Sequence, residues 1–426
     1  MTELSYTVRI VLAGATLLGT TGGVLGCFAL LRRQSLLGDA LAHAALPGVC
    51  TAYLLTYSKQ PLPLFAGALV AGLLGAWTIV VITRRSRIKE DTAIGIVLSV
   101  FFGIGILLLT YIQRLPTGNQ SGLDRLLFGQ AATLLERDVL QMTLLAGAVL
   151  LVVGLLFKEF KLLCFDREFA ASSGLPTRRL ELLLTTLLVV VVVVGLQTVG
   201  VVLIVATLIT PAAAARQWTE RLGVMLLLAG AIGGTAGAGG AMLSATVADL
   251  PTGPVIVLCA SSVLVVSLLL APRRGLVWAT IDEHRVARRI RRENLLKDLY
   301  TWIERHGGAW SQRVPASFVM GLRGDSGRRI GRTARRLAAS GSIDYAPGWL
   351  SLTDRGLRDA ERVVRKHRLW ELYLTRRLEL ASDHVHRDAD TMEHALTDEA
   401  VAKLEQVLGH PTRDPHGRPI PPGRAA

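Results

Sequence analysis

The chain has 426 residues, 51% of them hydrophobic, and 47 Lys and Arg outnumber 33 Asp and Glu to give a formal net charge of +14. Residues 1–271 hold only 18 of the basic and 13 of the acidic side chains, whereas the 155 residues that follow hold 29 and 20. This uneven distribution excludes a single soluble globule and indicates a membrane-embedded part followed by a basic soluble part.

Long apolar runs between clusters of charge predict nine membrane-spanning helices in the first part. A helix of about 20 residues crosses the hydrocarbon core while satisfying its own backbone hydrogen bonds. Gly195, Gly200 and Pro211 interrupt the sixth and seventh runs, which leaves open one crossing plus a broken, pore-lining segment. The expected helices cover residues 6–31, 40–57, 61–83, 93–113, 138–157, 180–196, 199–215, 223–243 and 254–271.

The basic residues of the membrane part concentrate in alternate loops. With the N-terminus outside, the inner loops hold 15 Lys and Arg and the outer segments hold five. Positive charge is retained on the cytoplasmic side during insertion. We therefore expect the chain to lie among the lipids of the bacterial inner (cytoplasmic) membrane, with the N-terminus outside and the soluble part in the cytoplasm.

An ionisable pair interrupts the second expected helix. Asp39 and His43 are four residues apart among small residues, and no other histidine precedes residue 272. Ionisable groups inside a membrane are costly and by default mark an ion pathway or a binding site. A carboxylate oxygen with an imidazole nitrogen suits manganese, iron or zinc. The structural alternative is that Asp39 caps the helix and His43 packs against a neighbour.

Four segments of the first part resemble motifs of the permease subunits of ATP-binding-cassette importers for zinc, manganese and iron. They are 37–48, 90–96, 123–129, and 199–203 together with 210–216. The resemblance covers residues 1–272 and implies an all-α polytopic fold of the type II importer kind. It also implies a pore formed by two permease subunits, either two copies of this chain or this chain and a sister permease. Asp39 and His43 are implied to contact the metal in transit. The implied partners are a cytoplasmic ABC ATPase and a metal-binding solute-binding protein.

The chain has no phosphate-binding loop of the form GxxxxGK[ST], since no Gly is followed by Lys anywhere in it. Such a loop is what cradles the phosphates of a nucleotide in many ATPases. We therefore expect this chain to bind no nucleotide, and to be a transport subunit and not an enzyme. ATP hydrolysis is expected from the separate partner.

The inner loop 158–179 predicts a short helix that begins near Asp166 and ends near Gly174. It resembles the coupling helix that docks on the ATPase, and Glu168, Phe169 and Ala170 lie within it. The alternative is an interfacial helix that lies on the membrane surface.

The soluble part begins with a basic linker, 273–289, and a winged helix–turn–helix is expected over 290–355. A helix with an apolar face ends at His306, a second helix covers 326–339, and two strands flank Pro347 and Gly348. Five arginines lie on one face of the second helix and suit a phosphate backbone. Water or anionic lipid is the alternative partner of this face. The candidate DNA contacts are Arg328, Arg329, Arg332, Arg335 and Arg336.

The last segment, 356–426, predicts a helical metal-sensor and dimerisation domain. His367 and Glu371 are one helical turn apart, and a single expected helix carries four more candidate ligands on one face: His386, Asp390, Glu393 and His394. Such mixed ligands suit iron, manganese or zinc. From about 290 to 422 the chain resembles the iron- and manganese-dependent repressors, including the diphtheria toxin repressor. The resemblance assigns His367, Glu371 and His386 to the ancillary metal site and Asp390, Glu393 and His394 to the primary site.

Two departures from the repressor pattern affect this assignment. The first-helix ligand positions hold Asn294 and Lys297, a weak ligand and a cation. No segment of this chain resembles the SH3-like third domain of that family. The carboxylate–histidine face is therefore either a metal sensor or a structural and dimerising remnant.

The leading hypothesis is an importer permease for a divalent transition metal with a metal-responsive cytoplasmic domain that feeds back on transport. A second keeps the pore and makes the soluble part a membrane-tethered, DNA-binding regulator. A third is an ion-coupled secondary transporter, for which few intramembrane acids besides Asp39 are available.

Overall fold

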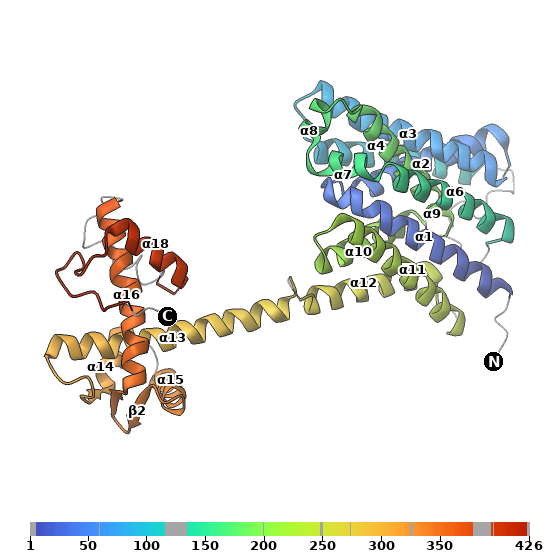
Figure 1. The fold of residues 1–426 in the computed structure, drawn as a ribbon. Helices are drawn as coiled ribbons and strands as arrows, with labels where there is room; N and C mark the ends of the chain where they lie inside the picture. Colours follow the sequence, from blue (N-terminus) through green and yellow to red (C-terminus); the bar gives the residue numbers. More distant parts are fainter. Residues whose placement is uncertain are drawn as a thin grey trace. The chain divides into compact units, whose positions relative to one another are not determined.

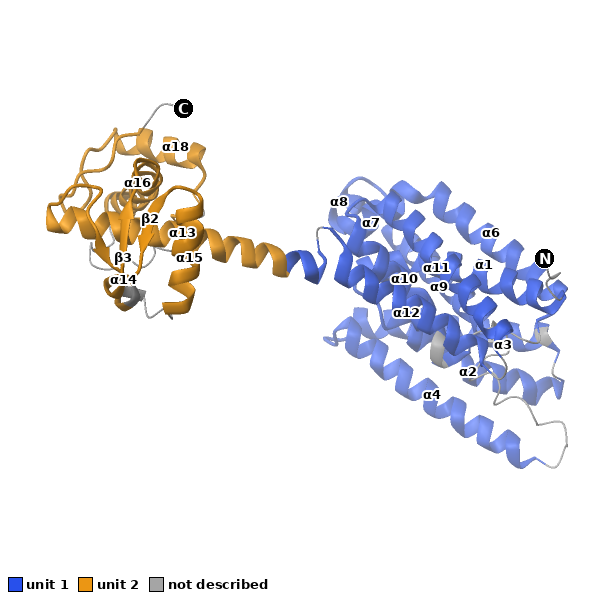
Figure 2. Cartoon of the chain, turned by 90° about the horizontal axis from the view of Figure 1, so that it is seen from below, with its two compact units in different colours: residues 1–279 blue, residues 280–426 orange. Residues whose placement is uncertain are grey.

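The computed structural model describes residues 6–58, 60–115, 134–198, 200–247, 250–272, 274–323, 327–377, 393–394 and 396–423. The chain forms two compact units, Met1–Ala279 and Thr280–Ala426 (Figure 2). The motif at 123–129, as well as His386 and Asp390, lies outside the described residues.

The first unit is built of helices that coincide with the nine expected ranges to within a few residues. Two short helices, α7 (Phe157–Phe165) and α8 (Arg167–Ser172), follow the fifth of them. The long helices are α1 (Tyr6–Leu31), α2 (Leu37–Thr56), α3 (Pro61–Arg85), α4 (Glu90–Arg114), α6 (Glu136–Leu155), α9 (Thr177–Thr198), α10 (Val201–Trp218), α11 (Leu222–Thr246) and α12 (Thr252–Leu270).

Seven of the described helices are long and apolar enough to cross a membrane: α1, α3, α4, α6, α9, α11 and α12. The other two expected spans, α2 and α10, pack inside the unit against several of these helices. In α2 the polar side chains of Asp39 and His43 lower the hydropathy. A membrane core with α2 and α10 enclosed among its helices is the arrangement that positions this pair.

The boundary between the sixth and seventh expected spans lies at Gly200. This residue has a positive φ of 87° and precedes α10, so α9 and α10 are separate helices. A side chain would be strained in this conformation, and glycine adopts it without that cost. A feature that the sequence pattern did not predict is α7, which starts after a break at Leu156.

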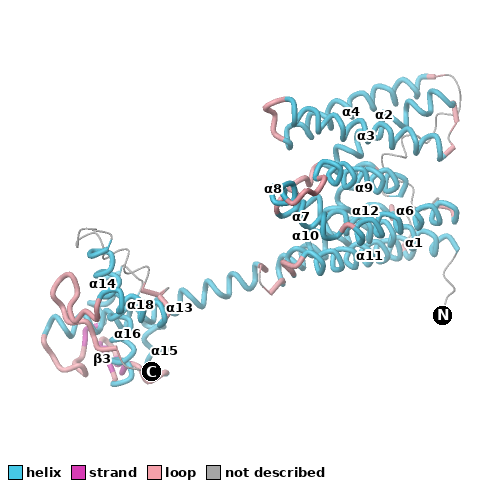
Figure 3. The backbone as a smooth tube through the Cα atoms, turned by 45° about the horizontal axis from the view of Figure 1, so that its top comes forward, coloured by secondary structure: helices cyan, strands magenta, loops and turns pink. Residues whose placement is uncertain are grey.

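The helices form two groups (Figures 1 and 3). One group contains α2, α3 and α4, and the other contains α1, α10, α11 and α12. Between them lies α9, which contacts α1, α2, α3 and α10. Hence α2 reaches both groups through α9 and α10, and its residues sit where the two groups meet.

Glycine permits α1 and α11 to approach closely within the second group. A Cβ atom added to Gly19 would lie 2.1 Å from the carbonyl oxygen of Gly233, and one added to Gly233 would lie 2.0 Å from that of Gly19. Small residues allow such backbone contact between membrane helices, where packing is the main source of stability.

The second unit carries the winged helix and the last helical segment. Its elements are α13 (Leu276–His306), β1 (Val314–Pro315), α14 (Ala316–Arg323), α15 (Gly327–Ala339), β2 (Ile343–Ala346), β3 (Trp349–Leu352), α16 (Asp354–Arg377) and α18 (Asp398–Leu408). The strands form an antiparallel sheet in the order β1-β3-β2. The two expected strands and the helix at 326–339 are present, and the expected linker 273–289 is helical from Leu276 onward.

Candidate functional sites

Asp39 and His43 lie one turn apart in α2, with Nε2 of His43 3.4 Å from Oδ1 of Asp39. The helix begins at Leu37 and its first turn contains Asp39, while no side chain caps its N-terminus. Asp39 therefore does not cap the helix, whereas His43 packs against a neighbour, Phe102, as the structural alternative expects. The flanking residues Ala40 and Ala44 are buried and small.

The imidazole of His43 also has one unsatisfied nitrogen. Nδ1 is buried and has no hydrogen-bond partner among the described residues, and the ring packs edge-on against Phe102 of α4 at 4.7 Å between centroids. The side chains of His43 and Asp39 are 16% and 32% exposed. The imidazole nitrogen Nε2 beside the carboxylate of Asp39 is a donor pair of the kind that a transition-metal ion binds.

The predicted helix in the loop after α6 is present as α8. Oδ1 of Asp166 accepts a hydrogen bond from the backbone N–H of Phe169 and so caps the helix, and Gly174 follows it with a positive φ of 81°. Ala170 is buried, whereas Glu168 and Phe169 are exposed. Exposed aromatic side chains such as Phe169 are enriched at protein–protein interfaces.

A carboxylate at the start of α9 connects α8 to two other segments. Glu181 lies 3.1 Å from Arg167, 3.4 Å from Arg84 at the end of α3, and 3.6 Å from Arg32 after α1. These residues line a cavity of about 540 Å³ that Glu90 also borders. Glu181 therefore links α8 to the loop that leads into α2.

The arginine row on α15 has the expected geometry. Ala334 and Leu337 are buried against the winged-helix core. The side chains on the opposite arc are exposed: Arg328, Arg329, Arg332, Arg335 and Arg336. This helix therefore presents a continuous basic surface to solvent, as a phosphate-binding helix does.

Three of the predicted metal ligands, His367, Glu371 and Glu393, meet at a buried cluster between α13, α16 and the turn at 393–394. Nδ1 of His367 lies 2.6 Å from Oε2 of Glu393, and Nε2 lies 3.0 Å from Oε1 of Glu371. Burial acts to lower the pKa of His367, but its hydrogen bonds to Glu371 and Glu393 outweigh this effect and the pKa is raised.

His394 lies beside this cluster with partners from α13. Its Nδ1 is 2.6 Å from Oε2 of Glu293, and its Nε2 is 3.1 Å from Oδ1 of Asn294. Burial favours a higher pKa for Glu293, but the hydrogen bonds from His394 and Arg289 lower it. Glu393 and His394 lie in a turn, so the single helix expected to carry them does not include them.

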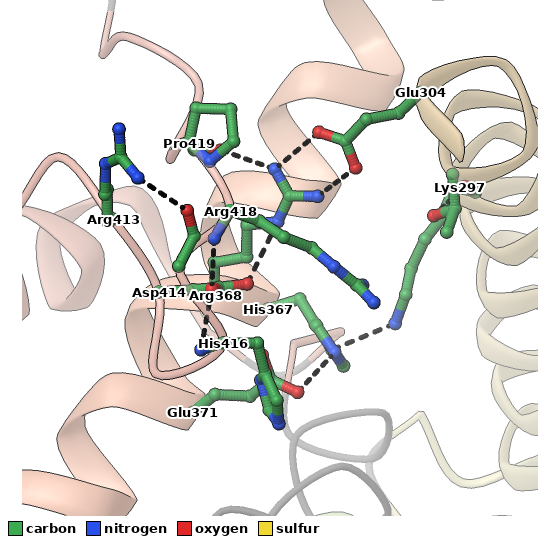
Figure 4. Close-up of polar contacts among 12 residues, drawn as sticks. Lys297, Glu304, His367, Arg368, Glu371, Arg413, Asp414, His416, Arg418 and Pro419 are labelled. Atoms are coloured by element: carbon green, nitrogen blue, oxygen red, sulfur yellow. Dashed lines mark hydrogen bonds and ion pairs between the residues drawn. The ribbon is translucent and has the colours of Figure 1, made fainter. Parts of the chain in front are cut away.

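A lysine completes the cluster. Nζ of Lys297 lies 2.9 Å from Nδ1 of His367 and 2.8 Å from Oε2 of Glu393. Figure 4 shows this side chain reaching from α13 toward His367. An ammonium group therefore lies at hydrogen-bond distance from two of the predicted ligands, His367 and Glu393.

In the described part of the chain, Glu371 also belongs to a second group of potential ligands, together with Asp414 and His416. One ligand atom each from Glu371, Asp414 and His416 lie within 4.8 Å of each other. However, Oδ1 of Asp414 accepts hydrogen bonds from the backbone N–H groups of His416 and Arg418, and Oδ2 lies 3.6 Å from Nε of Arg368 (Figure 4). These contacts of Asp414 hold the turn near the C-terminus.

Glu181 and Glu293 are site residues that the sequence did not predict. Each pairs with residues far away in the sequence, for which spacing gives no signal. Lys297 was recognisable as a departure from the repressor pattern, but its partners were not.

Comparison with known proteins identifies both parts. Residues 4–271 match the ABC 3 transport family, and residues 353–422 match the metal-binding and dimerisation domain of iron dependent repressors.

The full-length relatives agree with these matches. The manganese transport system membrane protein MntC of Bacillus subtilis (strain 168) is 44% identical over 404 residues, covering 94% of this chain and 92% of that protein. The zinc transport system membrane protein TroC of Treponema pallidum (strain Nichols) is 46% identical, covering 66% of this chain and 95% of that protein.

A solved structure matches the fold of the membrane unit. PsaBC from Streptococcus pneumoniae, in complex with Fab, aligns with a TM-score of 0.56 and 36% identity, covering 63% of this chain and 93% of that one. Both resemblances seen in the sequence are thereby confirmed. The chain therefore belongs to the ABC 3 transport family, as a membrane permease of the metal-transport kind that carries a C-terminal domain of the iron dependent repressor type.

Proposed function

We propose that this chain is the permease subunit of an ATP-driven importer of divalent transition metals, and that Asp39 and His43 contact the cation in transit. The observation that carries the proposal is the donor pair of α2, in which Nε2 of His43 lies 3.4 Å from Oδ1 of Asp39. Manganese, zinc and iron all suit such a pair. Relatives named for manganese, zinc and chelated iron transport support this substrate class.

The exposure of the pair indicates a second permease. Asp39 is 32% exposed in the single chain. A carboxylate facing lipid would be costly, so this face of α2 is expected to line a water-containing path. We infer that another permease, identical or related, closes the path on this side.

The orientation and the ATPase partner follow from the charge distribution and from α8. With the basic loops inside, α8 and the second unit lie in the cytoplasm. The exposed Phe169 and Glu168 then face an ABC ATPase. A solute-binding protein would deliver the metal to the opposite side of the membrane.

The direct test is metal accumulation in proteoliposomes containing the chain and its ATPase. We expect manganese uptake that requires ATP hydrolysis and stops with a non-hydrolysable analogue. Uptake driven by a proton gradient in the absence of ATP would instead support the secondary-transporter alternative.

For the second unit, the arginine row of α15 favours a membrane-tethered regulator that binds DNA. The full chain in lipid nanodiscs should bind duplex DNA with a strong salt dependence, and replacing Arg332 with Ala should reduce the salt slope by about 1. The exposed Arg305, outside the row, provides a control whose replacement with Ala should leave the slope unchanged. Binding unaffected by Arg332→Ala would indicate that the row faces lipid or water.

The metal-responsive role requires a cation to reach His367 and Glu393.

A further inference from the structure

The cluster of α13, α16 and the 393–394 turn is almost completely shielded from water. The side chains of Glu393 and Glu371 are 0% and 1% exposed, and those of Lys297 and His367 are 10% exposed. Buried carboxylates are stable only when paired with a cation or bound to a metal. The identity of the cation that neutralises them decides what this domain responds to.

The chain itself supplies that cation. The Lys297 ammonium donates to Oε2 of Glu393, the same atom that lies 2.6 Å from Nδ1 of His367. A divalent ion bound to both atoms would lie against the ammonium, and two unscreened positive charges at such a distance in a buried site repel strongly. The ammonium and a metal ion therefore exclude one another at this position.

The neighbouring donors are also used within the chain. Both ring nitrogens of His394 have partners on α13, Glu293 and Asn294, and Nε2 of His367 pairs with Glu371. Together with Lys297, these pairs connect α13 to α16 and to the turn through charged hydrogen bonds, which are stronger than neutral ones. The same elements would be brought together by a bound metal ion.

We propose that Lys297 is a built-in replacement for the metal ion of this repressor-type domain, and that it holds α13, α16 and the 393–394 turn together whether or not cytosolic metal is present. The domain would then act on its target, whether DNA or the permease, without sensing metal at this position. This inference is independent of the proposed transport function, because every residue involved lies in the second unit.

The test is hydrogen–deuterium exchange of the full chain in lipid nanodiscs, read over peptides of α13 and α16, with either chelator or millimolar Mn²⁺. In the wild type we expect the same protection in both conditions. In Lys297→Glu we expect exchange of these peptides to rise at least about tenfold in chelator and to return toward the wild-type level with Mn²⁺, since the variant has a ligand in place of the ammonium. A wild-type chain that gains protection with Mn²⁺ would overturn the proposal.

Lys366 provides the matched control. It is another buried lysine of the same domain, and its Nζ contacts the carbonyl oxygen of Leu396 and the carboxylate of Asp398. Lys366→Glu makes the same change of charge, and its loss of protection should not be reversed by Mn²⁺. Equal recovery of both variants would show a non-specific effect of metal and contradict the proposal.

A second measurement needs no variant. Acetylation of lysines by an amine-reactive reagent, followed by mass spectrometry, reports whether Nζ of Lys297 is accessible. We expect Lys297 to be as unreactive in Mn²⁺ as in chelator. A rise in its reactivity with Mn²⁺ would mean that the metal displaces the ammonium, and it would refute the proposal even if Lys297→Glu fails to fold.

Discussion

Gly19 of α1 and Gly233 of α11 lie with their backbones in contact, because a Cβ atom on either one would come within about 2.1 Å of the other's carbonyl oxygen. This contact sets the distance between two helices against which α10 also packs.

Replacing Gly233 with Ala should push α1 and α11 apart. The added methyl group would meet a backbone carbonyl, which cannot move aside as a flexible side chain would. We therefore expect the free energy of unfolding to fall by about 1–3 kcal/mol, the usual cost of overpacking. The change is measured as the midpoint of thermal unfolding in detergent, with aggregation as the readout. Gly239→Ala in the same helix is the control, because a Cβ there meets nothing within 4 Å. Equal midpoints for both variants would show that the contact is not limiting.

Phe169 of α8 should be needed for the ATPase to respond to the permease. Phe169 is 57% exposed and lies outside the described hydrophobic core, so Phe169→Ala should not unfold the chain. We expect the substitution to reduce metal-stimulated ATP hydrolysis by about tenfold, because an exposed aromatic anchor is lost from the contact with the ATPase. Phe165, at the end of α7, is 56% exposed and offers a matched control. If Phe165→Ala and Phe169→Ala reduce hydrolysis equally, α8 is not the docking element.

Glu181 should transmit the position of α8 to the segment before α2. Glu181→Gln removes the negative charge that Arg167, Arg84 and Arg32 share and leaves like charges near one another. We expect ATP hydrolysis to continue while metal uptake falls, so that the number of ions moved per ATP decreases.

Glu220, which forms one exposed ion pair with Arg274 at 3.2 Å, is the control for this coupling. Glu220→Gln should leave the ratio unchanged, since exposed pairs contribute little. A normal ratio in Glu181→Gln would contradict the role of Glu181.

Arg368 should stabilise the second unit. It is 3% exposed, and its guanidinium bonds Glu304 of α13 and the backbone oxygen of Pro419 (Figure 4). Arg368→Leu leaves Glu304 without its partner, and breaking a buried pair in this way costs about 3–5 kcal/mol. Native-state hydrogen exchange of α16 measures the loss. The exposed Arg362 of the same helix is the control, and its replacement with Leu should change exchange little.

Much of this architecture is predictable from the sequence, because hydrophobic length and charge follow local rules. Local sequence was enough to predict the nine helical ranges, α8 with its cap at Asp166, and the arginine face of α15. The contacts of Glu181 and Lys297 were not, since each joins segments that are distant in the chain. For the same reason, the spacing of Glu393 and His394 predicted a helix, whereas tertiary contacts with α13 hold them in a turn.

The most direct test of the account is uptake of radioactive manganese into proteoliposomes that contain the ATPase and either the wild-type chain, Asp39→Asn or His43→Gln. Both substitutions keep the size of the side chain close to the original and remove the charge or the imidazole. We expect each to reduce the initial rate of uptake by at least about tenfold, equivalent to about 1.4 kcal/mol, while the chains remain folded. Uptake at the wild-type rate in both variants would contradict the claim that the cation passes these two side chains.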